Sequence, residues 1–204
     1  MVMPAEKRYM DTFLVISQGI GLAVACGVRP FLPAVLAGGL AASDTGLSYS
    51  GTDFSFLQST PFLIAMVAAL AVVLGYERRR PGSFQAGPLA AGLAGVAIGL
   101  GALEFAASLQ DEGHPAWPGI LGGLICAAIA QAAARGVFAG AAQRLDEEAR
   151  AAVPLFEEGA AVLVAALAIG VPPVSLVVLA ALAALLARTR QRAGRKYAGL
   201  RILR

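Results

Sequence analysis

The chain has 204 residues, of which 58% are hydrophobic and only 14% are charged, and its formal net charge at pH 7 is +3. Soluble domains carry about 25% charged residues, and the mean hydropathy here is +0.72, so the composition excludes an ordinary soluble domain. It predicts an all-α, polytopic integral membrane protein. Alanine and glycine dominate over large side chains, and small residues let membrane helices pack closely.

A polar N-terminal tail, residues 1–10, has no pattern of a cleavable signal peptide. The apolar stretch 11–42 follows and is broken at Gly27-Val28-Arg29-Pro30-Phe31-Leu32-Pro33. As one straight helix it would measure about 48 Å at about 1.5 Å per residue, whereas the hydrocarbon core is about 30 Å thick. This length favours a re-entrant hairpin with the N-terminus outside. A single tilted crossing stays open as the alternative, because Glu6-Lys7-Arg8 weakly favours a cytoplasmic N-terminus.

Three uninterrupted apolar segments come next, at residues 61–76, 88–109 and 117–139. A membrane-spanning helix needs about 20 residues. Each segment is therefore predicted to cross the membrane once, the first with slightly extended ends.

The last apolar stretch, 154–187, is broken at Gly170-Val171-Pro172-Pro173 and is followed by a basic tail, 188–204, with seven Lys or Arg. Arginines also mark the loops after residues 76 and 139, and the positive-inside rule places such loops in the cytoplasm. Both ends of 154–187 are then inside, so this stretch is predicted to be a second hairpin. The two hairpins would enter from opposite faces, with their tips meeting near the midplane. Residues 11–187 would form one transmembrane domain of three full spans and two broken, re-entrant hairpins.

The basic tail adjoins a membrane segment, which argues against nucleic-acid binding and for a cytoplasmic C-terminus. We therefore expect a multi-pass protein of the plasma (inner) membrane, with membrane lipids as partners and anionic headgroups attracting the tail. A homodimer stays open, because five short elements make a small bundle.

The sharpest functional candidate is Arg29, at the first break. Paired interruptions of membrane helices point to a transport site, and a charge at that depth usually faces a cavity or a partner. A guanidinium binds phosphate or carboxylate in a two-pronged fork, and the half-helix that starts at Pro30 presents amides that favour anions. The alternative is that Arg29 ties the break together by bonding freed carbonyls, or pairs with Glu104. The predicted substrate-binding residues are Gly27, Arg29, Pro30, Pro33, Gly170, Pro172 and Pro173.

Four further polar residues lie within apolar segments and support this site. Glu104 either reaches the outer interface, pairs with Arg29 or serves as a proton or cation site. Gln131 and Arg135 are four residues apart and share a helix face, which predicts a polar lining toward the inner side. Glu157 or Glu158 could pair with Arg135; the alternative is that Arg135 snorkels to the interface.

Other residues indicate packing rather than chemistry. Gly119, Gly123 and Ala127 predict a close helix contact, as do Gly95 and Gly99. The two cysteines lack metal-ligand spacing, so we expect buried thiols, no metal and no cofactor. Enzyme signatures such as a phosphate loop ahead of a lysine or HExxH are missing, and we expect no enzyme.

The segment from Gly19 to Pro33, which contains Gly-Val-Arg-Pro-Phe-Leu-Pro, resembles the opening of a family of small bacterial membrane proteins described as a domain of unknown function. Tyr76-Glu77-Arg78 is also similar to that family. The resemblance extends over most of the chain and implies no activity. The hairpin layout also resembles lipid-carrier flippases and small anion transporters, at the level of fold. We expect a transporter or flippase for an anionic solute or lipid phosphate, or alternatively a non-transporting membrane scaffold or partner-binding protein.

Overall fold

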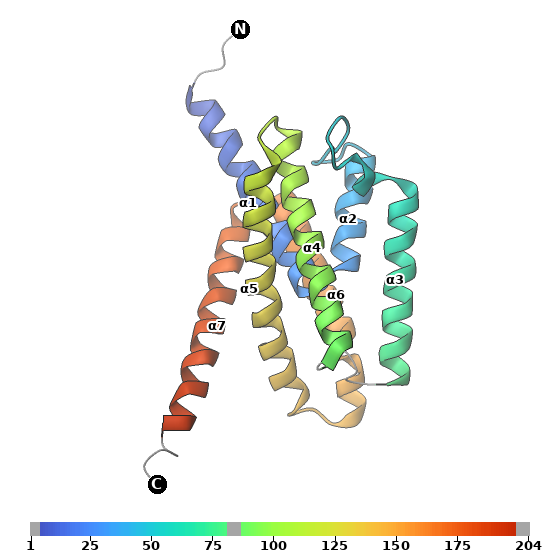
Figure 1. Ribbon diagram of the computed structural model, residues 1–204, viewed down its shortest axis with the longest axis vertical. Helices are drawn as coiled ribbons and strands as arrows, with labels where there is room; N and C mark the ends of the chain where they lie inside the picture. The colour runs from blue at the N-terminus through green and yellow to red at the C-terminus, as the bar shows by residue number, and fades with distance from the viewer. Residues whose placement is uncertain (1–4, 81–86, 199–204) are drawn as a thin grey trace.

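Every secondary-structure element is a helix in the computed structural model, which describes residues 5–80 and 87–198 (Figure 1). Six of these helices are long and apolar enough to cross a membrane, and α2 is a shorter apolar helix. This confirms the all-α class, and the six apolar helices are compatible with a multi-pass helical membrane bundle. The elements are α1 (Ala5–Val28), α2 (Phe31–Ala42), the 3₁₀ turn η1 (Ser55–Gln58), α3 (Thr60–Arg79), α4 (Gly87–Asp111), α5 (Ala116–Ala142), α6 (Glu147–Gly170) and α7 (Val174–Ala198).

Helices α6 and α7 differ most from the sequence prediction, which counted three full spans. Within them, the segments Ala149–Gly170 and Val174–Gln191 each reach the length of a span. The prediction from the apolar stretch 154–187 made both helices too short, because α6 begins and α7 ends with polar residues that still belong to the helices. Likewise, α1 begins at Ala5 inside the predicted N-terminal tail, and α7 continues to Ala198 inside the predicted basic tail. Residues 1–4, 81–86 and 199–204 lie outside the described part of the chain.

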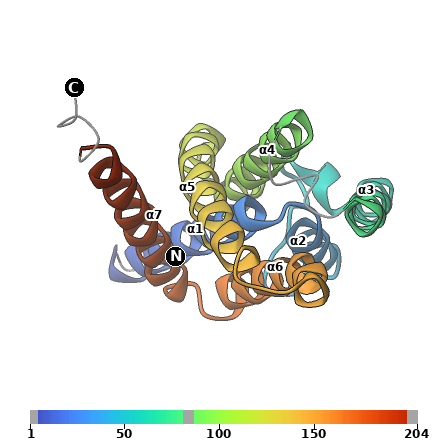
Figure 2. The same cartoon turned by 90° about the horizontal axis from the view of Figure 1, so that it is seen from below.

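Helix α1 is central, and α4, α5, α6 and α7 all pack against it (Figure 2). Glycines permit this close approach. A Cβ at Gly27 would lie only 2.5 Å from the backbone oxygen of Ala127 on α5, and a Cβ at Gly19 would overlap the ring of Phe105 on α4. Small side chains therefore let one helix run through the middle of the bundle.

The predicted contact along Gly119 and Gly123 is confirmed. A Cβ at either position would lie 2.6 Å from a backbone Cα of α4. The prediction that Gly95 and Gly99 pack in the same way is wrong for the described part of the chain, where no atom lies within 4 Å of a Cβ built at either one. These two glycines lie on an open face of α4.

The two breaks reverse the chain in opposite directions. Helices α1 and α2 join at the Arg29–Pro30 link and open toward one end of the bundle, whereas α6 and α7 open toward the other (Figure 1). The space beside Gly21 is filled by Ala168 and Ser175, the residues on either side of the α6–α7 turn. Gly21 precedes Arg29 by eight residues, or about 12 Å along a helix. The predicted meeting of the two tips is therefore wrong, because the hairpins pass alongside one another.

Candidate functional site

Arg29 lies in the short link between α1 and α2. Its backbone N–H closes the last turn of α1 by donating to the carbonyl of Ala25 at 3.1 Å. Pro30 follows with φ −76°; it has no N–H to donate and its ring disfavours continuing the helix. The side chain of Arg29 is nevertheless buried, with the residue only 5% exposed. The break thus holds a guanidinium inside the bundle.

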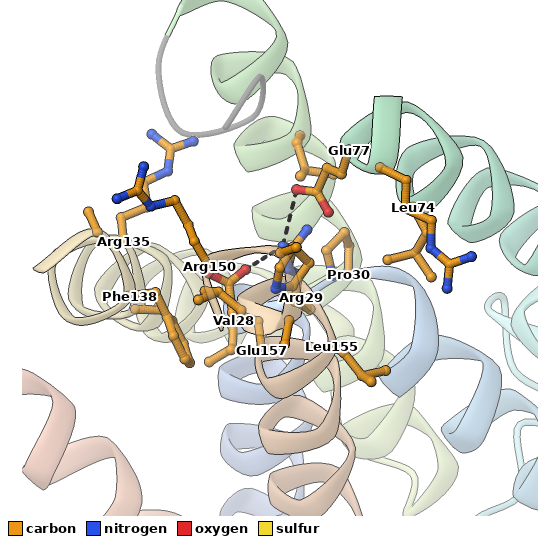
Figure 3. Close-up of a pocket in the computed structure, with 18 of the residues that line it drawn as sticks. Val28, Arg29, Pro30, Leu74, Glu77, Arg135, Phe138, Arg150, Leu155 and Glu157 are labelled. Carbon is orange, nitrogen blue, oxygen red and sulfur yellow. Dashed lines mark hydrogen bonds and ion pairs between the residues drawn. The ribbon is translucent and has the colours of Figure 1, made fainter. Parts of the chain in front are cut away.

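Three glutamates from two other helices lie within ion-pair distance of this guanidinium, and two of them, Glu77 and Glu157, are seen in Figure 3. The Nη2 atom donates to Glu77 Oε1 of α3 at 3.2 Å and contacts Glu157 Oε2 of α6. The Nε atom lies 3.9 Å from Oε1 of Glu158, also on α6. Among the described residues, all ion pairs are made by Arg29. We call Arg29, Glu77, Glu157 and Glu158 the Arg29 cluster.

Local features of α3 and α6 place these carboxylates. Helix α6 starts at an N-cap, Asp146, whose side chain accepts from the N–H of Ala149 at 2.8 Å. Pro154 lies inside α6, where a proline interrupts the hydrogen-bond ladder and bends the helix, and Glu157 and Glu158 follow one turn later. Glu77 lies near the end of α3, a peripheral helix whose packing is mainly against α2 (Figure 2). The Arg29–Glu77 ion pair therefore ties that helix end to the bundle.

The Arg29 cluster is charged unevenly and is incompletely hydrogen-bonded. It has three carboxylates for one guanidinium. Arg29 Nε, Glu77 Oε2 and both side-chain oxygens of Glu158 have no hydrogen-bond partner in the described part of the chain. More than about 90% of buried polar groups in proteins have one. Such unpaired atoms mark a place where a proton, water or a ligand can be bound.

A cavity of about 290 Å³ leads to the Arg29 cluster and is lined by the α1–α2 link, α3, α4, α5 and α6 (Figure 3). Its described lining contains four arginines and two glutamates. Arg29 is buried at its base, whereas the other three arginines are exposed. The charged lining residues are Arg29, Arg78, Arg135, Arg150, Glu77 and Glu157.

Two of the exposed arginines are anchored to backbone rather than to carboxylates. Arg135 Nη2 donates to the carbonyl of Ala90. Arg150 donates from Nε to Ala142 O at 3.0 Å and from Nη2 to Leu145 O at 3.1 Å. Backbone carbonyls hold these side chains without neutralising them, so the cavity retains positive charge.

Gln131 and Arg135, predicted to share a polar helix face, both line the cavity. The suggested pairing of Arg135 with Glu157 or Glu158 is wrong, because both glutamates pair with Arg29. The mutual positions of α1 and α6, which sequence spacing does not give, decide this pairing.

Glu104 is separate from this site and both structural roles suggested for it are wrong. It is fully buried, so it does not reach the interface, and Arg29 is not its partner. Its Oε2 accepts a hydrogen bond from the Tyr49 hydroxyl at 2.7 Å. Tyr49 belongs to the segment between α2 and η1, which folds over Glu104. Burial, followed by the nearby carboxylate, raises the pKa of Tyr49 well above its ordinary value, so the phenol stays protonated and donates.

The other predicted binding residues do not reach the cavity. Gly27 packs against α5 and Pro33 is fully buried. Gly170 ends α6, and Pro172 and Pro173 lie in the turn to α7, whose flanking residues contact Gly21; none of the three lines the cavity. Of the seven predicted substrate-binding residues, only Arg29 and Pro30 line it. The prediction joined the two breaks because it assumed that their tips meet.

Sequence reasoning missed Glu77 as a site residue and gave Glu157 the wrong partner. A signal existed for each. Glu77 ends an otherwise apolar segment, and Glu157 belongs to an adjacent acidic pair shortly after a helix-interior proline. Carboxylates so near apolar spans are costly and need partners.

Comparison with known proteins finds no match to a family model, to a curated protein or to a solved structure. The Arg29 cluster and its cavity are the features of the molecule that bear on its function.

Proposed function

We propose that the protein is a membrane transporter for a small anion that carries a phosphate or carboxylate group. The observation that carries the proposal is the cavity that connects exposed arginines with the buried guanidinium of Arg29. A phosphate-bearing headgroup offers the same chemistry as a free anion, so a flippase-like activity is included.

The charge of the cavity favours an anionic guest. Four arginines oppose two glutamates in the lining, and a cleft with one predominant sign of charge concentrates counter-ions between low-dielectric walls. The guanidinium of Arg29 retains an N–H at Nε that has no hydrogen-bond partner among the described residues. It can therefore offer donors to an incoming phosphate or carboxylate.

The size of the cavity favours a small guest. Ligand pockets usually measure about 300–1,000 Å³, and this cavity, at about 290 Å³, is at the lower end. A free anion or an isolated headgroup fits such a volume, while acyl chains would have to remain in the lipid.

The arrangement of α1 and α2 supports a transport role. Helix α2 has 12 residues, which is about 18 Å of helix and too short for a hydrocarbon core of about 30 Å. We read α1–α2 as a re-entrant hairpin whose irregular link is acceptable at depth because it lines a cavity. By the positive-inside rule, the end with Arg78, Arg144 and Arg150 is cytoplasmic, in the plasma (inner) membrane. The cavity would then open to the cytoplasm.

Transport is tested with purified protein in sealed liposomes. One arm measures uptake of radiolabelled inorganic phosphate, sulfate and methyl phosphate, and the other measures flipping of a fluorescent phospholipid. The critical variant is Arg29→Lys, which keeps the charge but loses the planar fork. Arg144→Lys, at an exposed position, is the matched control.

The proposal predicts activity in one arm, its loss in Arg29→Lys and its retention in Arg144→Lys. Folded wild-type protein that is inactive in both arms would contradict the proposal and favour the scaffold alternative. One observation favours the scaffold alternative. No residue in the most apolar part of α3 is buried within the described chain, so this helix has a free apolar surface.

A further inference from the structure

We infer that the anion moves together with a proton, which is bound by the carboxylates of the Arg29 cluster and first by Glu158. This inference rests on the proposed function and deepens it by naming what drives transport. It is carried by the charge surplus of the cluster and by the contacts that Glu158 lacks.

The charge surplus makes full ionisation of the cluster unfavourable. Glu77, Glu157 and Glu158 all lie within 4.0 Å of one guanidinium. With every carboxylate ionised, the cluster would have an excess of two negative charges. Uncompensated buried charge is strongly disfavoured next to the membrane interior, so at least one carboxylate is expected to take up a proton.

Glu158 is the least stabilised as an anion. Its side chain is 3% exposed, and both of its oxygens lack a hydrogen-bond partner in the described part of the chain. Its nearest cationic atom is Arg29 Nε, at 3.9 Å. By contrast, Glu77 accepts a hydrogen bond from Arg29 and Glu157 is in close contact with it. The carboxylate of Glu158, buried and without a hydrogen-bond partner in the described part of the chain, is therefore the proton site.

The other charged groups near Glu158 are the members of the Arg29 cluster and two exposed arginines that line the cavity. Glu77 of α3 and Glu157 of α6 disfavour its charge, and Arg29 favours it. Arg135 of α5 and Arg150 of α6 are bound to backbone carbonyls. Metal binding is a weaker reading, because the described residues contain no group of three or more His, Cys, Asp or Glu arranged to hold an ion.

Proton binding and anion binding assist each other in this geometry. An anion needs guanidinium donors that now face carboxylates, and it is repelled by each ionised glutamate. When a proton from a hydronium ion in the cavity passes through the Arg29 cluster to Glu158, an O–H bond of the hydronium breaks and leaves water, an O–H bond forms on the carboxylate, and the negative charge of Glu158 disappears. The anion then replaces that charge beside Arg29. By linkage, a proton that strengthens anion binding is itself bound more tightly when the anion is present, by the same factor.

Sulfate is the appropriate probe, because its charge does not change near neutral pH. Wild-type protein is placed in liposomes that contain a pH-sensitive dye, and sulfate uptake is measured with and without a proton gradient. We expect uptake to rise roughly tenfold when protons are supplied from the side where sulfate enters, a factor typical of coupled sites. The interior should acidify in step with uptake.

The variants separate coupling from transport itself. Glu158→Gln should remove the pH dependence of uptake, whatever its maximal rate. Glu112→Gln, at an exposed position outside the cluster, should keep both uptake and coupling. If Glu158→Gln does not fold, proton movement with the wild-type protein still decides whether uptake is coupled to protons.

The outcomes are distinct. Sulfate uptake that is indifferent to the gradient and brings no acidification would overturn proton coupling while leaving anion transport intact. A pH dependence that persists unchanged in Glu158→Gln would overturn the assignment of the proton site. Absence of uptake for all three anions and of lipid flipping would remove both proposals.

Discussion

Arg29 and Glu158 face each other with Nε and Oε1 3.9 Å apart, and neither atom has a hydrogen-bond partner among the described residues. A charge-assisted hydrogen bond between such groups normally measures about 2.7–2.9 Å. On the other side of the same guanidinium, Nη2 is already in contact with Glu77 and Glu157. The guanidinium is thus held firmly on one side and loosely on the other, and the loose side is the one we expect to change when a proton or an anion binds.

Removing the guanidinium should destabilise the protein strongly. Arg29→Ala would leave three buried or half-buried carboxylates without their cation, and breaking a buried ion pair on one side costs about 3–5 kcal/mol. We expect a large fall in the thermal unfolding temperature in detergent. The double variant Arg29→Ala/Glu157→Gln removes the guanidinium together with the carboxylate in closest contact with it and should recover part of the loss.

The matched control for that series is Arg144→Ala, whose side chain is exposed and makes no described ion pair. It should change the free energy of unfolding by less than about 0.5 kcal/mol. An Arg29→Ala protein as stable as this control would show that the Arg29 cluster does not hold α1, α3 and α6 together.

Two glycine substitutions test the packing that positions Arg29. Gly27→Ala would place a Cβ 2.5 Å from the backbone oxygen of Ala127, and overpacking of this kind costs about 1–3 kcal/mol. Gly99→Ala adds the same atom where nothing lies within 4 Å, and should stabilise α4 by up to about 1 kcal/mol. Opposite shifts in unfolding temperature are predicted. Equal shifts would contradict the close contact of α1 with α5.

Replacing only one partner of the Tyr49–Glu104 hydrogen bond should lower the stability more than expected from replacing both. Tyr49→Phe leaves the buried carboxylate of Glu104 without its donor, and an unsatisfied buried group costs about 1–3 kcal/mol. Adding Glu104→Gln removes that buried charge, so the double variant should be less destabilised than the sum of the two single variants. A double-mutant cycle on thermal or denaturant unfolding measures this difference, and strict additivity would exclude the interaction.

The raised pKa of Tyr49 predicts that the stability of the protein depends on pH in the alkaline range. Its pKa is raised by burial and then by Glu104, so the unfolded state loses the phenolic proton first as pH rises. The stability that depends on the protonated phenol is complete below about pH 10, the ordinary tyrosine pKa, and is lost as pH rises through the folded-state pKa. Unfolding temperatures above pH 10 should fall less steeply for Tyr49→Phe than for the wild type. An identical slope would show that Tyr49 is not buried against Glu104.

Part of this architecture could be predicted from the sequence. The segments that became α3, α4 and α5 are uninterrupted apolar runs of spanning length, and the break at Arg29 is marked by glycine and two prolines. The extent of α6 and α7 could not be read from hydropathy, because residues such as Arg150 and Arg188 belong to the helices. Apolar runs report the lipid-facing length of a helix and not its ends.

The candidate site was predicted only at its centre. Arg29 stood out because arginine is rare at a helix break within an apolar stretch. Its partners did not, because Glu77, Glu157 and Glu158 are 48 or more positions away, and which helices meet depends on packing of small residues that alanine-rich sequences repeat everywhere. The role of Glu104 was missed for the same reason, since its partner Tyr49 comes from a connecting segment.

The most direct test of the central claim is the access of water and anions to the base of the cavity. Val28→Cys places a thiol beside Arg29 in the cavity lining, in a background where Cys26 and Cys126 are alanine, and a membrane-impermeant maleimide is applied from each side. Our account predicts labelling from the side of Arg144 and Arg150 only, slowed by sulfate or phosphate, with no such slowing when Arg29 is lysine. Labelling that is absent, or that anions do not affect, would contradict an anion site at Arg29.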